Sequence, residues 1–198
     1  MVSKGCRLSP ETRAPGAVED ACAVLRDLIA RAAHHGIAPG RIALCGDSAG
    51  GAICIGAAAL AARSGLALRH LALFYPAIDP ACDTASQNAL ADGPVLTRAA
   101  MRWFWDQHLG PDPATGGLLP LDIADPSILQ PTTVTVAAYD LLRDEGAAFA
   151  DRLSQAGVDT ILSVAPGLVH GFLSLPVSAL AIDAALSETA RRLRHGLS

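Results

Sequence analysis

The chain has 198 residues, and its 15 Lys and Arg against 19 Asp and Glu give a formal net charge of −4. Apolar residues make up 51% and charged residues 17%, which is typical of one folded domain with a sizeable core and excludes a disordered chain. The one basic cluster is Arg191, Arg192 and Arg194, which we interpret as the solvated end of a last helix. Because phosphate recognition needs a concentrated basic surface, we expect no nucleic-acid partner.

The sequence also argues against membrane insertion and secretion. The uncharged run Ser48–Ala62 is too short to span a bilayer, and the longer run Ala165–Ile182 is interrupted by prolines and glycines. Met1–Pro10 is polar and lacks the apolar core of a signal peptide. We therefore expect a cytoplasmic protein with no membrane partner. The cysteines, which are dispersed and not spaced as a zinc or redox pair, are Cys6, Cys22, Cys45, Cys54 and Cys82.

Helices and short apolar runs alternate in the first part of the chain. Ala17–Ala33 carries apolar side chains at the spacing of one helical face, and Gly36 provides a helix stop. The short apolar run Arg41–Cys45 predicts a buried strand. The small residues of Ala49–Arg63 predict a helix, and Leu71–Tyr75 predicts another strand.

The middle of the chain is less regular. Ala81–Pro94 and Gly116–Pro131 are interpreted as loops. Between them, Thr97 is expected to cap a helix that runs to about His108. The β-branched run Thr132–Ala137 predicts a strand. The last predicted elements are the helix Asp144–Ala156, the strand Asp159–Val164 and the helix Ser178–His195.

This alternation indicates an α/β fold with a mostly parallel sheet flanked by helices on both faces. No repeat or linker divides the chain, so we treat residues 1–198 as one domain, with residues 79–110 as an expected cap or pocket insertion. In such folds ligands bind at the carboxyl ends of the strands. Residues at those ends are therefore the candidates for chemistry.

The strongest local motif is Gly46–Gly51, which reads G-D-S-A-G-G and matches the G-x-S-x-G nucleophile elbow between a strand and a helix. A sharp turn there lifts the Ser48 hydroxyl clear of the sheet, and Gly46 and Gly50 remove Cβ atoms that would clash. The backbone N–H of Ala49 then points at a developing oxyanion. The motif predicts a serine nucleophile.

A serine hydroxyl needs a base, and the base needs an orienting acid. Asp140 follows the predicted strand Thr132–Ala137, and His170 follows the strand Asp159–Val164 after a Pro-Gly loop. The chain order Ser, Asp, His is the order of an α/β-hydrolase. We therefore predict Ser48, Asp140 and His170 as nucleophile, acid and base.

Two other aspartates compete for the role of the acid. Asp144 would lie one turn into the following helix, away from the strand end, and Asp79 follows the strand Leu71–Tyr75. We favour Asp140 over both. Asp47, next to the nucleophile, is expected to brace nearby loops.

The sequence resembles the hormone-sensitive-lipase-like branch of the α/β-hydrolases, the bacterial short-chain esterases, over almost its whole length. The resemblance implies the same three catalytic residues and adds Glu11 as a supporting residue. Cys6 stands where the family has Tyr, and Leu141 where it has Pro. The matching segments are Cys6–Glu11 for Y-R-L-A-P-E, Gly46–Gly51 for G-D-S-A-G-G, Asp140–Glu145 for D-P-L-x-D-E and His170–Phe172 for H-G-F.

The resemblance also reveals a departure near the start of the chain. The family's H-G-G-G loop, which supplies oxyanion donors, has no counterpart, and Met1 falls where the fourth strand of the family begins. The resemblance therefore implies that roughly the first third of the family domain is absent from this sequence, and we expect a misplaced gene start, a fragment or a natural truncation as the cause. Loss of one oxyanion donor costs about 10² to 10³ in rate. Val2–Gly5 would be a strand without neighbours, and such an exposed edge predicts homo-oligomers.

Other residues give weaker signals. Trp103, Phe104 and Trp105 are consecutive, so at least one should reach a surface, a cap or the acyl pocket, although core packing is the commoner role. His34 and His35 are expected at a solvated helix end. His70, His108 and His195 show no partner pattern, and no cluster has metal-ligand spacing.

These observations predict a serine carboxylic-ester hydrolase that acts on small esters with short acyl chains and needs no cofactor and no metal. Amide and thioester substrates stay open, because the same residues serve acyl transfer generally. One alternative is a catalytically impaired fragment, as the missing oxyanion loop suggests. Another is a non-catalytic ligand-binding protein on the same fold, which the presence of His170 disfavours.

Overall fold

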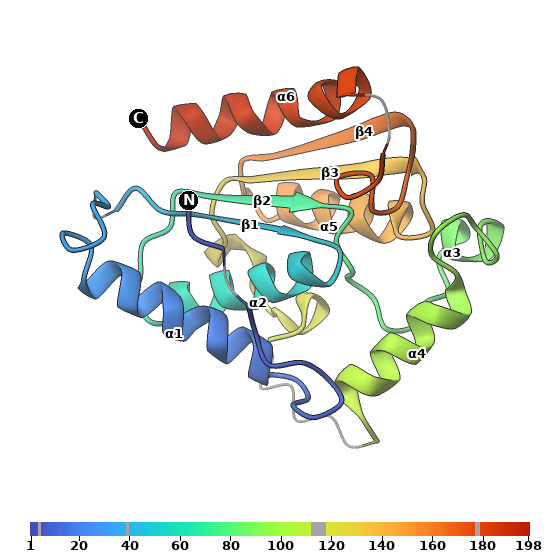
Figure 1. Ribbon diagram of the computed structural model, residues 1–198, viewed down its shortest axis with the longest axis horizontal. Coiled ribbons are helices and arrows are strands. Elements are labelled where there is room, and N and C mark those ends of the chain that lie inside the picture. Colours follow the sequence, from blue (N-terminus) through green and yellow to red (C-terminus); the bar gives the residue numbers. More distant parts are fainter. Residues whose placement is uncertain (4, 39, 112–117, 177–178) are drawn as a thin grey trace.

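In the computed structural model the strands form one parallel sheet (Figure 1). The structure describes residues 1–3, 5–38, 40–111, 118–176 and 179–198, and within them the sheet has 4 strands in the order β1-β2-β3-β4. The predicted α/β fold with a parallel sheet is therefore confirmed. The strands are β1 (Ala43–Asp47), β2 (His70–Phe74), β3 (Thr132–Tyr139) and β4 (Thr160–Val169).

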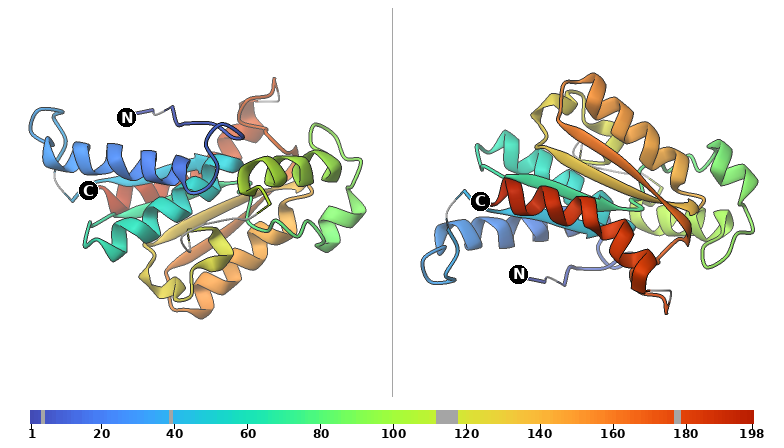
Figure 2. Two further views of the ribbon diagram at one scale, coloured as in Figure 1. Left: turned by 90° about the horizontal axis from the view of Figure 1, so that it is seen from below. Right: turned by 90° about the horizontal axis from the view of Figure 1, so that it is seen from above.

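Helices cover both faces of the sheet, as Figure 2 shows from below and from above. Of the described helices, α6 lies on one face, α2 and α5 lie on the other, and α1 packs outside α2. The short α3 and the longer α4 lie beyond the carboxyl ends of the strands (Figure 1). The helices are α1 (Gly16–Ala30), α2 (Ala49–Arg63), α3 (Ala85–Ala89), α4 (Arg98–Leu109), α5 (Arg143–Gln155) and α6 (Ala179–Gly196).

The core lies on both sides of the sheet because the central strands β2 and β3 are buried along most of their length. Every residue of β2 is buried. Ile55 of α2 and Phe149 of α5 pack with Leu71 and Val134 on one face, and each such side chain contributes roughly 1.5 to 3 kcal/mol when fully buried. On the other face α6 covers a smaller cluster around Phe172.

Two predicted elements differ from the structure in ways that affect the site. The strand predicted to end at Val164 continues as β4 to Val169, because an edge strand tolerates Pro166, which lacks an N–H donor. His170 therefore follows the strand directly, and no Pro-Gly loop separates them. The predicted loop Ala81–Pro94 contains α3, whose first turn is capped by Thr84.

The predicted strand at the start of the chain does not form. Val2, Ser3 and Gly5 have no strand conformation, and Lys4 lies outside the described residues. The uncovered edges of the described sheet are therefore β1 and β4. Association through an exposed edge stays a prediction. The predicted start of the last helix, Ser178, also lies outside the described residues.

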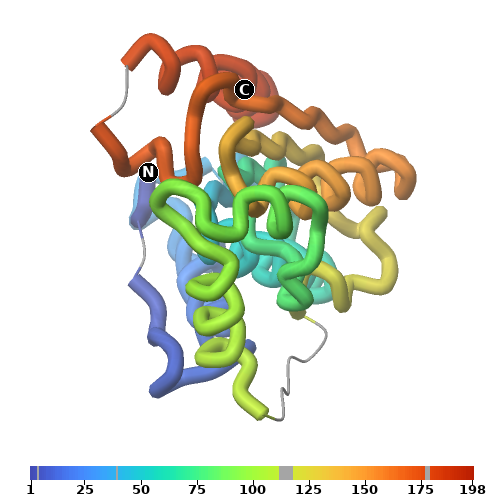
Figure 3. The backbone as a smooth tube through the Cα atoms, turned by 90° about the vertical axis from the view of Figure 1, so that its right-hand side faces the viewer, coloured from blue at the N-terminus to red at the C-terminus, as the bar shows by residue number. Residues whose placement is uncertain are grey.

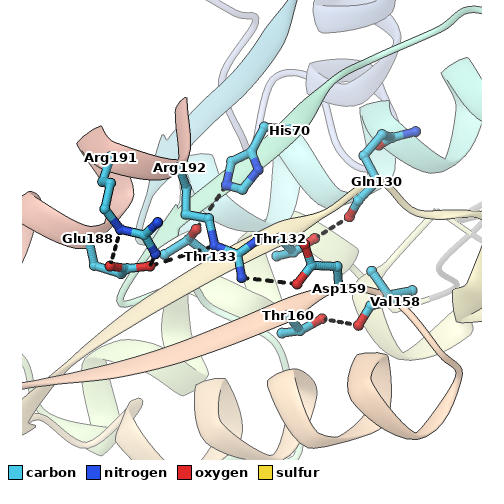
Figure 4. A network of polar contacts seen from close by, with 10 residues as sticks. All are labelled: His70, Gln130, Thr132, Thr133, Val158, Asp159, Thr160, Glu188, Arg191 and Arg192. Atoms are coloured by element: carbon cyan, nitrogen blue, oxygen red, sulfur yellow. Dashed lines mark hydrogen bonds and ion pairs between the residues drawn. The ribbon is translucent and has the colours of Figure 1, made fainter. Parts of the chain in front are cut away.

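An ion pair joins the end of α6 to the residue that precedes β4 (Figure 4). Arg192 binds Asp159 through its Nη1 and Nη2 atoms, at 2.5 and 3.0 Å, and its side chain is only 19% exposed. Arg191 pairs with Glu188. The interpretation of this cluster as a merely solvated helix end is therefore wrong for Arg192. None of the described helices combines the length and the apolarity needed to cross a membrane.

Candidate active site

Ser48 lies in a sharp turn between β1 and α2. Its φ of 51° and ψ of −122° are unusual for a residue with a side chain, and such strain persists only where the surroundings fix the backbone. The Ser48 N–H donates to the Phe74 carbonyl at 2.9 Å, and the Ser48 carbonyl accepts from the Gly51 N–H at 3.0 Å. The neighbouring strand and the first turn of the helix therefore hold the turn in place.

Glycines allow this turn to form because the backbone comes very close to its neighbours. A Cβ on Gly46 would lie 2.3 Å from the Gly50 carbonyl oxygen, and a Cβ on Gly51 would lie 2.6 Å from the Pro76 Cβ. A Cβ on Gly50, in contrast, would meet only Asp47 Oδ1, at 3.9 Å. Gly46 and Gly51 are thus required sterically, and Gly50 is not.

The structure brings Ser48, His170 and Asp140 together at the carboxyl ends of β1, β3 and β4. The Ser48 Oγ lies 3.0 Å from His170 Nε2, and His170 Nδ1 lies 2.8 Å from Asp140 Oδ2. Asp140 is 1% exposed, and its other oxygen accepts from the Leu142 N–H at 2.9 Å. A hydroxyl, an imidazole and a buried carboxylate in this chain of bonds can pass a proton away from the hydroxyl.

The two rival aspartates do not bind the imidazole. Asp144 accepts from the Ser86 N–H at 2.7 Å and pairs with Arg143. Asp79 accepts from the Ala81 N–H at 2.8 Å. Both carboxylates therefore stabilise local loops, and the preference for Asp140 agrees with the geometry.

Tyr75 supports the site, although sequence reasoning assigned it no role there. It is fully buried, and its hydroxyl donates to Asp47 Oδ2 at 3.2 Å. Burial raises the pKa of Tyr75, and the Asp47 carboxylate acts in the same direction, so the hydroxyl keeps its proton. This hydrogen bond joins Asp47 to the residue that follows β2, and the supporting role of Asp47 stays a prediction. Glu11 is exposed and makes no hydrogen bond or ion pair within the described chain, so the structure does not bring it to the site.

Ala49 is the first residue of α2, and its N–H is one of those without a partner inside the helix. The N-terminus of a helix favours negative charge. The position next to Ser48 therefore suits the predicted oxyanion donor, and its role stays a prediction.

A cavity of about 450 Å³ opens beside Ser48 and His170. Its lining is mainly apolar, and the segment 79–110 contributes to it through Leu96 and α4. Phe104 and Trp105 line the cavity, whereas Trp103 is 57% exposed. The cavity also takes residues from the N-terminal segment, from α1 and from α2; examples are Leu8, Val18 and Ile53.

A buried carboxylate lies behind the loop that carries Asp140. Glu145 Oε1 accepts from the Ile78 N–H at 2.8 Å, and Oε2 accepts from Gln87 Nε2 at 3.1 Å. Burial raises the pKa of Glu145 to about 7. The residue therefore joins α5 to the loop after β2 and to α3. Sequence reasoning quoted Glu145 only as part of a motif.

Within the described residues, no group of three His, Cys, Asp or Glu side chains could hold a metal ion.

Comparisons with known proteins agree with the geometry. A family model described as alpha/beta hydrolase fold matches residues 1–174. The chain belongs to the alpha/beta hydrolase family. It is 37% identical to carboxylesterase NlhH of Mycobacterium tuberculosis strain H37Rv over 98% of the chain and 61% of NlhH.

One further relative and one solved structure are similar to this alpha/beta hydrolase. Ethyl acetate hydrolase of Pseudomonas putida is 34% identical over 88% of the chain and 56% of that enzyme. The structure of a bacterial heroin esterase superposes with a TM-score of 0.89 at 34% identity, covering 98% of the chain and 63% of the esterase. The chain thus spans about three fifths of the length of these relatives.

Proposed function

We propose that this hydrolase-family chain cleaves carboxylic esters through an acyl-enzyme on Ser48. The observation that carries the proposal is the continuous bonding from Ser48 Oγ to His170 to Asp140, with separations of 3.0 and 2.8 Å. A serine hydroxyl becomes a nucleophile when a neighbouring imidazole accepts its proton. Asp140 is the positioning acid, because it holds the imidazole and stabilises its cation.

The reaction proceeds in two halves. His170 Nε2 takes the proton as Ser48 Oγ attacks the ester carbonyl carbon, and the Ala49 N–H donates to the oxyanion that develops. The imidazolium then protonates the leaving alkoxide, and the C–O bond of the ester breaks. Water adds to the acyl-enzyme with His170 again as base, which releases the acid and restores Ser48.

The substrates are proposed to be small esters with short acyl chains. A cavity of about 450 Å³ with a mainly apolar lining suits an alkyl group and gives few polar contacts to a charged one. The name of the Pseudomonas putida relative, ethyl acetate hydrolase, supports the same substrate class.

The test is hydrolysis of p-nitrophenyl acetate and butyrate by the purified chain and its Ser48→Ala variant. We expect the variant to lose at least about 10³-fold in kcat/KM. Ser64→Ala, at the other end of α2, is the matched control and should keep the rate. A folded chain that hydrolyses neither ester, or a Ser48→Ala variant that keeps the rate, would contradict the proposal. The first result would favour the impaired fragment.

A further inference from the structure

The wall of the cavity carries a second polar pair, away from the Ser48–His170 bond. Ser9 Oγ lies 3.2 Å from His108 Nδ1, and both residues line the cavity. Ser9 comes from the N-terminal segment and His108 from the last turn of α4, and Figure 3 shows these two segments side by side. The Ala14 N–H also donates to the His108 carbonyl, at 2.9 Å. Ser9 therefore holds the imidazole, and Ala14 holds the backbone that carries it.

Most other polar groups on the wall are already occupied. The Arg7 guanidinium donates from Nε to Asp20 Oδ1 at 2.9 Å and from Nη2 to the Gly16 carbonyl at 3.3 Å. Beyond Arg7, the thiol of Cys6 and the Ser48–His170 pair, the polar side chains of the described lining are Ser9, His108 and Trp105. The indole nitrogen of Trp105 has no hydrogen-bond partner among the described residues, but it is buried. An indole N–H can only donate. A hydrogen-bond donor of a ligand in this apolar cavity must therefore find its acceptor mainly at His108.

The hydrogen-bond pattern decides which nitrogen of His108 carries the proton. Ser9 Oγ also lies 3.2 Å from the Thr12 carbonyl oxygen, to which it donates. A carbonyl can only accept, and a hydroxyl has a single proton, so Ser9 must accept from His108 Nδ1–H. Nε2 then keeps a lone pair. It has no hydrogen-bond partner within the described chain.

The surroundings keep this imidazole neutral. Trp105 packs against it with 6.0 Å between ring centroids, and burial lowers the pKa of His108. A neutral ring with its proton on Nδ1 presents an acceptor at Nε2 and no donor there.

We propose that His108 Nε2 is a specificity-determining acceptor that binds a hydroxyl group on the substrate, so that the cavity selects esters with a hydroxyl remote from the ester carbonyl. The predicted preference in kcat/KM rests on the proposed esterase function. The binding of the hydroxyl group to His108 Nε2 does not depend on hydrolysis of the ester. A group that can only accept, such as a ketone, forms no hydrogen bond with Nε2.

The first test compares kcat/KM for three ethyl esters that differ only at the fifth carbon of the acyl chain: 5-hydroxyhexanoate, 5-oxohexanoate and 5-methylhexanoate. A parallel set of 4-hydroxypentyl, 4-oxopentyl and 4-methylpentyl acetates places the same groups on the alcohol side. In at least one set we expect the hydroxy ester to exceed the methyl ester by about threefold to tenfold, the range that one net hydrogen bond gives. Equal rates in both sets, or a ketone that gains as much as the hydroxyl, overturn the proposal.

Variants assign the preference to His108. His108→Phe keeps a ring and removes the acceptor, so the hydroxy-to-methyl ratio should fall to about one. Ser9→Ala removes the acceptor of the Nδ1 proton, so the proton can move to Nε2. The kcat/KM of the ketone ester should then rise relative to that of the methyl ester. His195→Phe changes an exposed histidine of α6 and should leave all ratios as in the wild type. An unchanged hydroxy-to-methyl ratio in His108→Phe contradicts the assignment.

A binding measurement separates this inference from the esterase proposal. Dissociation constants of the same esters are measured by NMR titration on Ser48→Ala and on Ser48→Ala/His108→Phe. Tighter binding of the hydroxy ester to the first protein only, without hydrolysis by the wild type, supports the acceptor and rejects the esterase. Hydrolysis by the wild type with equal affinities in both proteins supports the esterase and rejects the acceptor.

Discussion

The ring of Tyr75 meets the imidazole of His170 edge to face, with 4.9 Å between the ring centroids and 63° between their planes. The other side of Tyr75 packs against Phe172 in the same way, at 5.0 Å. The imidazole is therefore held by three contacts: Ser48 at one nitrogen, Asp140 at the other and Tyr75 against the ring. This third contact fixes the tilt of the ring, which the two hydrogen bonds leave free.

Tyr75 variants should separate ring packing from the hydroxyl. Tyr75→Phe keeps the ring and loses the hydrogen bond to Asp47, so we expect a loss of about 1 kcal/mol in unfolding free energy and little change in kcat. Tyr75→Leu removes both aromatic contacts, so we expect a loss of about 1 to 3 kcal/mol and a lower kcat. Urea titration and ester hydrolysis measure the two effects. Equal kcat values in the two variants would mean that the ring does not orient His170.

The choice of acid can be tested with a matched pair of substitutions. Asp140→Asn should lower kcat by about 10³ to 10⁴, because the amide stabilises the wrong imidazole tautomer. Asp144→Asn keeps an acceptor for the Ser86 N–H and should change kcat by less than about tenfold. Initial rates with p-nitrophenyl butyrate decide the matter. A larger loss in Asp144→Asn would reverse the assignment.

The two glycines after Ala49 should respond oppositely to alanine. Gly51→Ala would place a Cβ 2.6 Å from Pro76 Cβ and 3.0 Å from Pro76 Cα, so we expect a loss of about 1 to 3 kcal/mol in unfolding free energy. The Cβ of Gly50→Ala meets no close neighbour in the first turn of α2, so we expect the unfolding free energy to rise by up to about 1 kcal/mol. Thermal and urea unfolding of the two variants test this difference, and similar stabilities would show that the elbow adapts to a Cβ.

Glu145 should make stability depend on pH. Its pKa is raised from 4.5 to about 7 in the fold, so the folded state holds a proton that the unfolded state releases between these values. The contribution of Glu145 to the unfolding free energy is therefore fully present below about pH 4.5. It is lost as the pH rises to about 7, by up to about 1.4 kcal/mol for each pH unit.

The Glu145→Gln variant provides the reference for this effect. Its amide stays neutral, and its NH₂ group can donate to Gln87 Oε1, which is buried without a partner. The difference in unfolding free energy, wild type minus variant, should decrease from pH 4.5 to 7 in urea titrations. A difference that stays constant, or that grows with pH, would show that Glu145 is ionised throughout this range in the fold.

The sequence predicted the site better than its surroundings. Ser48, Asp140 and His170 follow strand ends, and parallel strands bring their carboxyl ends to one edge, so their order in the chain sufficed to predict that they lie together. Tyr75 was missed because its role depends on a φ of 37° and on packing across the sheet. No local pattern encodes either. The pairing of Ser9 with His108 joins residues far apart in the chain, so periodicity could not indicate it.

The errors in the predicted strands also arise from contacts between distant parts of the chain. β4 extends through Pro166 because β3 provides partners up to Tyr139, with a register shift on the way. Proline and glycine in isolation indicate a loop, and only the neighbouring strand overrides that tendency. Conversely, the predicted strand at Val2–Gly5 has no such neighbour, and its described residues stay irregular.

The placement of α6 has a consequence for synthesis of the protein. Among the described helices, α6 covers one face of the sheet, where Phe74, Ala165 and Phe172 are buried. The strands of the described residues and the residues proposed for catalysis all precede α6 in the chain. A nascent chain can therefore assemble the described strands before α6 covers this face. During that interval the face is a target for chaperones and for aggregation.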